Sequence, residues 1–252
     1  MSPAQPDPVA AFQQRLIDRY TEIARLAGGL AHEIKNPLST IRLNMELLAE
    51  DFAGDDSPRA RRTLAKIGLV QRECQRLQDL LDDFLNFAKV RRLRLEPADL
   101  NEEVRQALDF FRPQAKEAGI EIAAYLQSDL PAVLLDREHF RSALLNLLLN
   151  AQQAMPKGGT LTVSTEAIPG GVALHLIDTG CGMDEHVRAH AFDAFYSTKS
   201  GGTGLGLATT RKIIEGHDGR IDVESEVGRG THFIIELPAP ARLPAASQEP
   251  PS

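Results

Sequence analysis

A histidine and its neighbours form the first group of residues whose types and spacing could do chemistry. On a helix, His32 lies about 200° around from both Leu30 and Ile34, so its imidazole faces water. A lone histidine is more often a buried structural residue, but this helical phase disfavours that role. Neutral imidazole is a nucleophile near pH 7, and the carboxylate of Glu33 can orient it and accept its proton. Asn36, one turn further on, can bind a water or a phosphoryl oxygen.

Two asparagines interrupt a strongly apolar helical stretch. Asn146 and Asn150 lie at i and i+4 on one face, between leucines at positions 144, 145, 147, 148 and 149. A carboxamide oxygen here can ligate Mg²⁺ held by a triphosphate, because Mg²⁺ prefers hard oxygen donors. Two ordinary exposed polar residues are the alternative, but the leucines leave only one narrow polar stripe.

A short turn rich in glycine follows a predicted apolar strand. Its sequence is Asp178-Thr179-Gly180-Cys181-Gly182. A carboxylate at a strand end can accept a hydrogen bond from an exocyclic amine, and Gly180 and Gly182 let a flat base approach the backbone. By itself the pattern is more often only a turn.

A second glycine-rich segment opens a predicted helix. It contains Gly202, Thr203, Gly204, Leu205 and Gly206. Backbone N–H groups at a helix start suit phosphates, and Lys199 just before them could reach a phosphate, although a loop lysine is usually only solvated. A dinucleotide-binding fold would need a strand directly before the glycines, where this chain has a loop, and the G-x-x-x-x-G-K-[ST] phosphate loop is absent.

The elements that must position these residues fall into two groups, because the hydrophobic period changes near residue 93. Before it, two helical stretches carry apolar residues three or four apart. A break at residues 54–58, with Ser57 as a cap and Pro58 in the first turn, predicts a helical hairpin. Two helices bury too little by themselves, so we expect dimerisation into a four-helix bundle, with packing on the C-terminal domain as the alternative. The two apolar seams are Ile23, Ala27, Leu30, Ile34, Leu38, Ile41, Met45 and Leu48, and Leu64, Ile67, Cys74, Leu77, Leu81, Phe84 and Ala88.

After residue 93, strands mix with helices, and most strands pair in hairpins. The pattern predicts an α+β fold in which helices cover one face of a sheet, an α/β sandwich rather than a doubly wound sheet. The predicted strands are Leu93–Glu96, Ile120–Leu126, Val133–Leu135, Thr160–Ala167, Val172–Ile177, Arg220–Glu224 and Thr231–Leu237. The predicted helices run from a cap at Asp99 or Asn101 to Gly119, from Asp136 to about Met155, and over Leu205–Glu215.

Composition excludes several classes of protein. The 252 residues carry a formal charge of −7, which opposes nucleic-acid binding, and Cys74 and Cys181 are too few for a tetrahedral zinc site. No apolar stretch approaches the roughly 20 residues that cross a bilayer, so we expect no membrane insertion by this chain. It is either self-contained or the cytosolic core of a membrane receptor. Residues 1–15 and the Pro-rich 239–252 are expected to be disordered tails.

The order of these motifs resembles the sensor histidine kinases of two-component systems over about residues 20–238. Ala31–Leu38 resembles the family's phosphoacceptor box and Asn146–Ala154 its Asn box. Asp178–Gly182 resembles the adenine-contacting box, and Gly202–Leu207 the glycine box that closes on ATP. The resemblance implies a dimerisation and phosphotransfer domain over residues 16–91, followed by a GHKL-type catalytic ATP-binding domain over residues 92–238.

What the resemblance implies for chemistry is ATP-dependent phosphorylation of His32, with Glu33 as its base. The phosphoryl group would then pass to an aspartate in the receiver domain of a response regulator, in the cytoplasm. Asn150 would be the Mg²⁺ ligand and Asp178 the adenine contact, with Asn146 and Lys199 near the phosphates. The Glu-x-x-Asn pattern that ends at Asn36 also resembles the one that supports dephosphorylation of the regulator.

Two alternatives remain, and one position departs from the family. A GHKL-fold ATPase would need a carboxylate where this chain has Asn146, because a base must activate water. A catalytically weak dimeric scaffold would bind partners without chemistry. Ala194 replaces the proline of the family's phenylalanine box, which puts the stiffness of the ATP lid in doubt.

Overall fold

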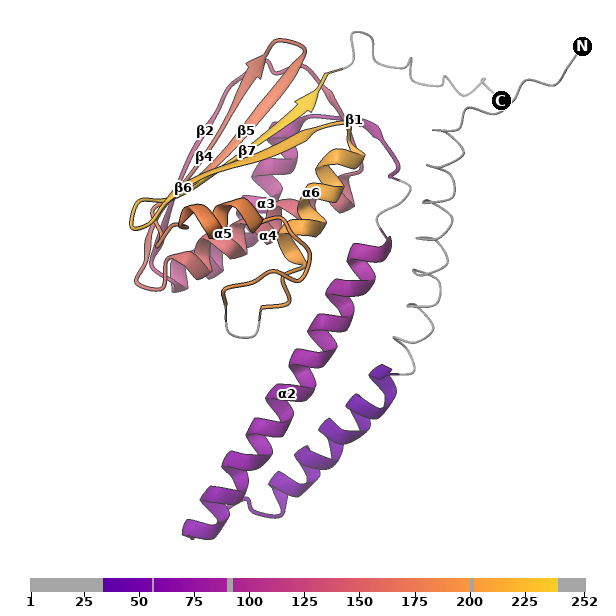
Figure 1. Ribbon diagram of the computed structural model, residues 1–252, viewed down its shortest axis with the longest axis vertical. Coiled ribbons are helices and arrows are strands. Elements are labelled where there is room, and N and C mark those ends of the chain that lie inside the picture. Colours follow the sequence, from indigo (N-terminus) through magenta and orange to yellow (C-terminus); the bar gives the residue numbers. More distant parts are fainter. Residues whose placement is uncertain (1–33, 56, 90–92, 200–201, 240–252) are drawn as a thin grey trace, which may run out of the picture. The chain divides into compact units, whose positions relative to one another are not determined.

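The structure, a computed structural model of the chain, describes residues 34–55, 57–89, 93–199 and 202–239. The predicted tails lie outside these residues, apart from residue 239. The chain divides between Lys89 and Val90 into a helical unit and a unit of mixed helices and strands, which Figure 1 draws in indigo to purple and in magenta to yellow. None of the helices in the described part has the length and apolar character that crossing a bilayer requires.

The helical unit is an antiparallel hairpin, as predicted. A helix over residues 34–50 is followed by a turn and by α2, Pro58–Lys89. Ser57 caps α2, since its Oγ accepts a hydrogen bond from the Ala60 N–H at 3.1 Å. The Asp55 carboxylate in turn accepts one from the Ser57 N–H at 2.8 Å. Local side-chain chemistry therefore sets the start of α2.

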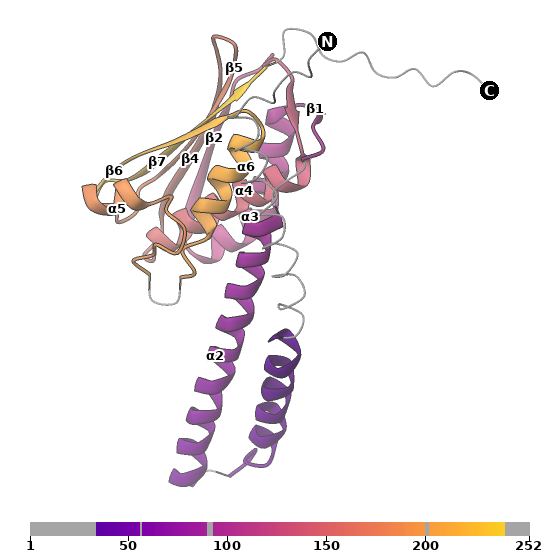
Figure 2. The same cartoon turned by 45° about the vertical axis from the view of Figure 1, so that its right-hand side comes forward.

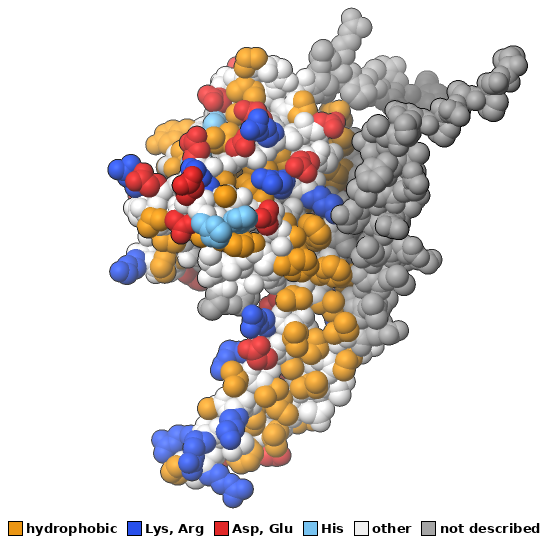
Figure 3. Space-filling model, viewed as in Figure 1, with side chains coloured by type: hydrophobic (Ala, Val, Ile, Leu, Met, Phe, Trp, Pro, Cys, Tyr) orange, Lys and Arg blue, Asp and Glu red, His pale blue; other side chains and the backbone are white. Residues whose placement is uncertain are grey.

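The two hairpin helices touch along a narrow seam. Leu38, Ile67 and Cys74 are buried, and an ion pair joins Lys35 to Asp82. Many other large apolar side chains stay exposed, and the space-filling view in Figure 3 shows hydrophobic side chains along the visible side of this unit. Seven of them are Ile41, Leu43, Leu47, Leu48, Leu69, Leu77 and Leu80, each at least 38% exposed. The single hairpin therefore leaves much of its apolar surface uncovered.

The second unit is an α+β sandwich, also as predicted. Its five-stranded sheet has the order β2-β4-β5-β7-β6, in which β2 and β4 run parallel and the other neighbours antiparallel. Helices α3, α4 and α6 lie on one face of the sheet in Figures 1 and 2. The five strands are β2, Ile120–Leu126; β4, Gly159–Ile168; β5, Gly171–Asp178; β6, Arg220–Glu226; and β7, Gly230–Pro238.

Side-chain caps set the limits of the helices that cover the sheet. Asp99 caps α3, Leu100–Glu117, and Asp136 caps α4, Arg137–Ala154, through its bond to the His139 N–H at 3.1 Å. The remaining helix of this layer is α6, Gly206–Gly216. The predicted helices agree with these limits to within one or two residues, because caps and apolar period are both local signals.

Two predictions about short elements need correction. The predicted strand Leu93–Glu96 is wrong in position, because β1 spans Glu96–Ala98 and pairs with β3, Val133–Leu135. The Arg94 N–H bonds instead to the carboxylate of Asp136 at 2.9 Å, outside any ladder. The short helix α5, Glu185–His190, was not predicted. Its six residues are too few for a helical period to be visible in sequence.

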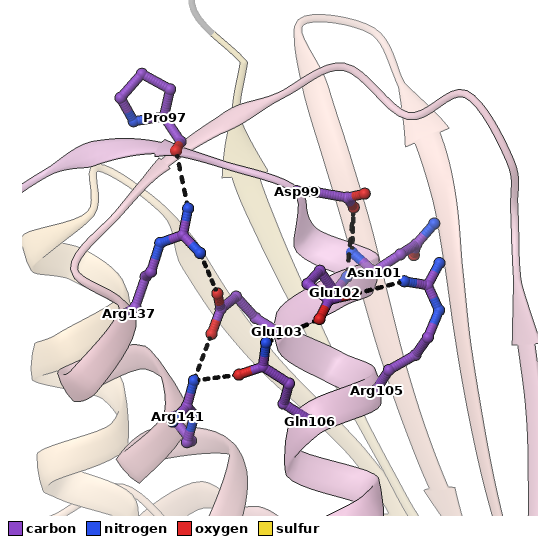
Figure 4. Close-up of polar contacts among 9 residues, drawn as sticks. All are labelled: Pro97, Asp99, Asn101, Glu102, Glu103, Arg105, Gln106, Arg137 and Arg141. Carbon is purple, nitrogen blue, oxygen red and sulfur yellow. Dashed lines mark hydrogen bonds and ion pairs between the residues drawn. The ribbon is translucent and has the colours of Figure 1, made fainter.

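A buried carboxylate fixes α3 against α4. Glu103 has no exposed side-chain surface, and it accepts hydrogen bonds from Arg137 at 3.0 Å and Arg141 at 3.1 Å. Figure 4 shows both guanidinium groups pointing from α4 to this carboxylate on α3. Arg141 also donates to Gln106 of α3 at 2.5 Å. The helix that carries both asparagines of the predicted site is thus held by charge-assisted bonds as well as by its leucines.

Candidate functional site

One face of α4 contacts three segments that are far apart in sequence. Asn146 meets the start of α6, Asn150 meets Lys199, and Ala154 meets the turn that follows β5. These three α4 residues are spaced four apart, so they lie in one row along the helix. The structure therefore brings three of the predicted motifs together on a single rigid support.

Asn146 joins the first turn of α6. Its Nδ2 donates to the Thr210 hydroxyl at 2.9 Å. A Cβ at Gly206 would stand 2.5 Å from the Asn146 Oδ1, so a side chain at position 206 would displace the Asn146 carboxamide. Within the described residues, α6 begins at Gly206 without a side-chain cap, so its first N–H groups can face an anion.

Asn150 directs its carboxamide oxygen to a cation. The Lys199 ammonium donates to Asn150 Oδ1 at 2.7 Å and to Gln153 Oε1 at 2.5 Å. Two neutral oxygens on one helix face thus share a single positive group. The same two oxygens are suited in chemistry to a hard metal cation.

Asp178 ends β5 as a buried carboxylate with one oxygen already satisfied. Its Oδ1 accepts hydrogen bonds from the N–H groups of Gly180 at 2.8 Å and Thr231 at 3.2 Å. Among the described residues no donor bonds to the other oxygen, Oδ2. Burial raises the pKa of Asp178 above its ordinary value, while the two N–H bonds and the charge of Lys199 act against this rise. A ligand that donates to Oδ2 would stabilise the ionised form.

The turn after Asp178 is fastened to α4 and to the β6–β7 hairpin. The Cys181 N–H donates to the Ala154 carbonyl at 3.0 Å, and the Cys181 carbonyl accepts from the Gly228 N–H at 2.8 Å. Gly182 lies against Glu226, where a Cβ would stand 2.0 Å from the Glu226 carbonyl oxygen. At Gly182 the close approach is therefore to protein backbone.

The glycine-rich segment is folded back on the residues before it. Gly204 has a φ of +69°, and its carbonyl accepts from the Phe195 N–H at 3.0 Å. The Gly202 N–H donates to the Lys199 carbonyl at 3.1 Å, and the Thr203 Oγ1 accepts from the Leu205 N–H at 3.4 Å. The Leu205 side chain is fully buried. Leu205 therefore anchors the segment, and only the backbone of Leu205 can face a ligand.

The residues of the predicted phosphoacceptor are placed only in part. His32 and Glu33 lie outside the described residues, whereas Asn36 is exposed on the helix over residues 34–50. The Asn36 carbonyl accepts a hydrogen bond from the Thr40 hydroxyl at 3.1 Å. This bond uses only the Asn36 backbone, and the Asn36 side chain is exposed on the helix surface.

Sequence reasoning missed three polar partners in this site. Gln153 stands three residues after Asn150, and this helical spacing was a usable signal. Thr210 stands four residues after Gly206 on the same helix, but only the packing of α6 on α4 shows that it meets Asn146. Thr231 contributes a backbone N–H from β7, which no sequence pattern could reveal.

Two family models match the chain. Residues 22–93 match the His Kinase A (phospho-acceptor) domain. Residues 135–241 match the histidine kinase-, DNA gyrase B- and HSP90-like ATPase family. Each match contains the motifs that the sequence assigned to that half of the chain.

Relatives match both halves at once. The chain is 33% identical over 225 residues to sporulation kinase E of Bacillus subtilis (strain 168), a match that covers 89% of this chain and 30% of that kinase. It is 32% identical over 222 residues to the sensor histidine kinase ZraS of Escherichia coli (strain K12), covering 88% of this chain and 46% of ZraS. The chain therefore spans less than half the length of these relatives.

A solved structure agrees with the sequence matches. Full-length ShkA in complex with AMPPNP has a TM-score of 0.68 and 32% identity, and the match covers 85% of this chain and 45% of ShkA. The paired domains, the ordered motifs and these relatives show that the chain belongs to the sensor histidine kinases of two-component systems.

Proposed function

We propose that this chain transfers the γ-phosphoryl group of ATP to His32 and then to an aspartate of a response-regulator receiver domain. The observation that carries the proposal is the row along α4. Along this row, α4 contacts the uncapped start of α6 through Asn146 and Lys199 through Asn150. It contacts the turn after Asp178 through Ala154. That arrangement offers contacts for the phosphates at one end and for an adenine amine at Asp178.

The residues at Asn150 fit a magnesium ion. The carboxamide oxygens of Asn150 and Gln153 already share one cationic group, the ammonium of Lys199. We infer that Asn150 holds Mg²⁺ when nucleotide is bound, with Gln153 beside it. A bound Mg²⁺ would neutralise charge on the β- and γ-phosphates. The ammonium of Lys199, released from Asn150, would then be free to contact a phosphate.

The proposed phosphorylation needs few groups from the protein. A lone pair on one imidazole nitrogen of His32 attacks the γ-phosphorus, and the bond from phosphorus to the β,γ-bridging oxygen breaks. The other ring nitrogen loses its proton to Glu33, and ADP leaves with the electron pair. Because ATP is supplied inside the cell, the proposed reaction belongs in the cytoplasm.

The hairpin fits a homodimer and a regulator partner. Its exposed leucines and isoleucine are the surface that a second copy would cover to form a four-helix bundle. We also propose that Asn36, exposed near the phosphoacceptor, positions water for dephosphorylation of the regulator.

Direct ATP hydrolysis is the competing activity, and one contact argues against it. A GHKL-type ATPase needs a base at position 146. The Asn146 amide cannot take a proton from water, and its Nδ2 is engaged by Thr210. The ATP-binding unit is therefore better suited to donate to a separate nucleophile than to activate water.

Incubation of the chain with γ-labelled ATP and Mg²⁺ separates the three candidate functions. A kinase gives protein-bound label that is stable in base and lost in acid, as expected of phosphohistidine. Phosphate release without protein-bound label would instead indicate a hydrolase. If neither labelled protein nor released phosphate forms, the chain is a scaffold. Asn150→Ala is expected to lose the label while the chain remains dimeric, and full labelling of that variant would remove the magnesium assignment.

A further inference from the structure

A buried histidine at the far end of α6 has no place in the chemistry above. His217 follows α6 and is 3% exposed. Its Nδ1 lies 2.8 Å from the Ile213 carbonyl, and its Nε2 lies 2.9 Å from the backbone nitrogen of Asp136. A carbonyl can only accept and an N–H can only donate, so Nδ1 carries the proton and Nε2 is an acceptor. The ring must therefore be neutral.

The partner of His217 is itself a junction of the fold. Asp136 caps α4 and accepts a hydrogen bond from the Arg94 N–H at 2.9 Å, near the point where the chain enters this unit. Burial alone would raise the pKa of Asp136, but bonds from Arg94 and His139 outweigh it and lower that pKa to about 2. The Asp136 carboxylate is thus ionised at neutral pH. Asp136 therefore connects the segment that enters this unit, the start of α4 and the end of α6.

Three contacts along the two helices hold α6 antiparallel to α4 and fix its register. Asp136 meets His217 at one end, Ala143 packs with Ile213 in the middle, and Asn146 meets Thr210 at the nucleotide end. Leu93 packs against the middle pair and also blocks space at Gly216, where a Cβ would stand 2.8 Å from it. A slide of α6 by one residue would move its start by about 1.5 Å along α4. Such a slide would displace the start of α6 from the asparagine row.

We propose that neutral His217 is a positioning residue for the nucleotide site, because its bond to the Asp136 N–H fixes the register of α6 on α4. The inference rests on the proposed function, since it assumes that phosphates bind between the start of α6 and the asparagines. An error of about 1 Å in such a site is costly for binding and for phosphoryl transfer. Protonation of His217 removes the acceptor, sets two N–H groups against each other and weakens nucleotide binding.

The surroundings of His217 agree with a neutral ring. Burial lowers the pKa of His217, the bond to Ile213 and the charge of Asp136 oppose that shift, and His139 adds to it. Phe140 of α4 contacts the ring edge-on with centroids 6.0 Å apart. The flanking acids Glu215 and Asp218 are exposed, and so is Arg94. His217 takes up a proton near pH 6.5 in the unfolded chain and at a lower pH in the folded chain. The contribution of neutral His217 to folding stability is therefore complete above pH 6.5 and is lost as the pH falls through the folded pKa.

Two substitutions separate positioning from simple stability. His217→Gln keeps an acceptor that cannot titrate, and His217→Leu fills similar space without an acceptor. Binding of a non-hydrolysable ATP analogue with Mg²⁺ is measured by calorimetry on the full chain, at about pH 5 and about pH 8. His139→Gln is the matched control, because it removes the neighbouring imidazole and leaves the His217 bond. The nucleotide itself titrates in this range, so each variant is compared with the unsubstituted chain.

We expect His217→Leu to weaken binding about 5-fold or more at both pH values. We expect His217→Gln to bind like the unsubstituted chain at pH 8 and to lose less affinity at pH 5, while His139→Gln keeps the full acid loss. Affinity in His217→Leu equal to that of the unsubstituted chain, with only a lower unfolding temperature, would overturn the proposal. So would an undiminished acid loss in His217→Gln, a measurement that stands even if the leucine variant does not fold. No nucleotide binding by the unsubstituted chain would remove the proposed function and this inference together.

Discussion

The two units of this chain differ in how completely each buries its own apolar residues. The ATP-binding unit closes a continuous core, in which Phe111, Phe140 and Leu174 are at most 1% exposed. The hairpin buries few of its large apolar side chains and leaves leucines such as Leu43 more than half exposed. One unit therefore buries its apolar core as a single copy, whereas the described part of the other leaves an apolar surface that the proposed dimer would cover.

This difference separates two kinds of stability. The free energy of unfolding of the ATP-binding unit should depend on its own buried contacts and not on protein concentration. The stability of the hairpin should depend on concentration, because association buries the apolar surface that the single copy exposes. Substitutions in one unit should leave the stability of the other unit largely unchanged.

The largest effect is expected from a charge placed in the exposed apolar surface of the hairpin. Leu77 is 50% exposed. In the variant Leu77→Glu, each dimer would contain two glutamates at this position. Burial of the exposed halves of two leucines is worth about 1.5–3 kcal/mol, and desolvation of two carboxylates adds to the loss, so the dimer dissociation constant should rise by about 100-fold or more. Sedimentation equilibrium measures the constant. Lys66→Glu, at an exposed and already charged position, is the control and should change it little. A Leu77→Glu dimer as tight as the unsubstituted one would contradict the comparison.

The next effect concerns nucleotide recognition in the ATP-binding unit. In Asp178→Asn the carboxamide oxygen must still accept from Gly180 and Thr231, so the NH₂ group turns to where the ligand donates. Two donors then oppose each other, and we expect affinity for ATP to fall about 10- to 100-fold. Calorimetry measures this loss, and the dimer should be unaffected. Undiminished affinity would show that Asp178 is not the adenine contact.

The sequence predicted most of this fold because its signals are local. Ser57 and Pro58, Asp99 and Asp136 each mark a helix start through contacts within a few residues. Alternation of apolar residues then predicted the long strands. The same locality explains the two misses, since β1 is set by pairing with β3 some 37 positions away and α5 has too few residues for a period.

The candidate site was predictable as a set of motifs but not as a geometry. Spacing placed Asn146 and Asn150 on one face, yet it could not show that Lys199 would occupy the Asn150 oxygen. Residues that act through distant partners gave no sequence signal. Glu103 looks like a surface acid of α3, and His217 like a loop histidine, until packing buries both. Burial of a polar group is a tertiary property, so a single sequence does not reveal it.

A smaller effect is expected from the ion pairs between α3 and α4. Glu103→Ala leaves Arg137 and Arg141 without their buried acceptor, but both are more than 40% exposed and can be rehydrated. We therefore expect a loss of about 1–3 kcal/mol in the unfolding free energy of the ATP-binding unit. Arg105→Ala, which breaks the exposed pair with Glu102, should cost at most about 1 kcal/mol. Urea unfolding measures both, and equal losses would contradict the role given to burial.

The smallest effect is expected at Asn36. Asn36→Ala changes an exposed side chain and should leave both autophosphorylation and dimer stability unchanged. It should slow dephosphorylation of a phosphorylated receiver domain several-fold, because the carboxamide would no longer place a water. Phosphate release from labelled regulator follows the reaction. An unchanged rate would leave the proposed phosphatase activity without support.

The most direct test of the account is to find where the phosphoryl group resides on the chain. After incubation with ATP and Mg²⁺, mass spectrometry under alkaline conditions should locate one phosphoryl group on His32, and His32→Gln should carry none while it still binds nucleotide. Phosphorylation of another residue, or unchanged labelling of His32→Gln, would contradict the claim that this ATP-binding unit serves that histidine.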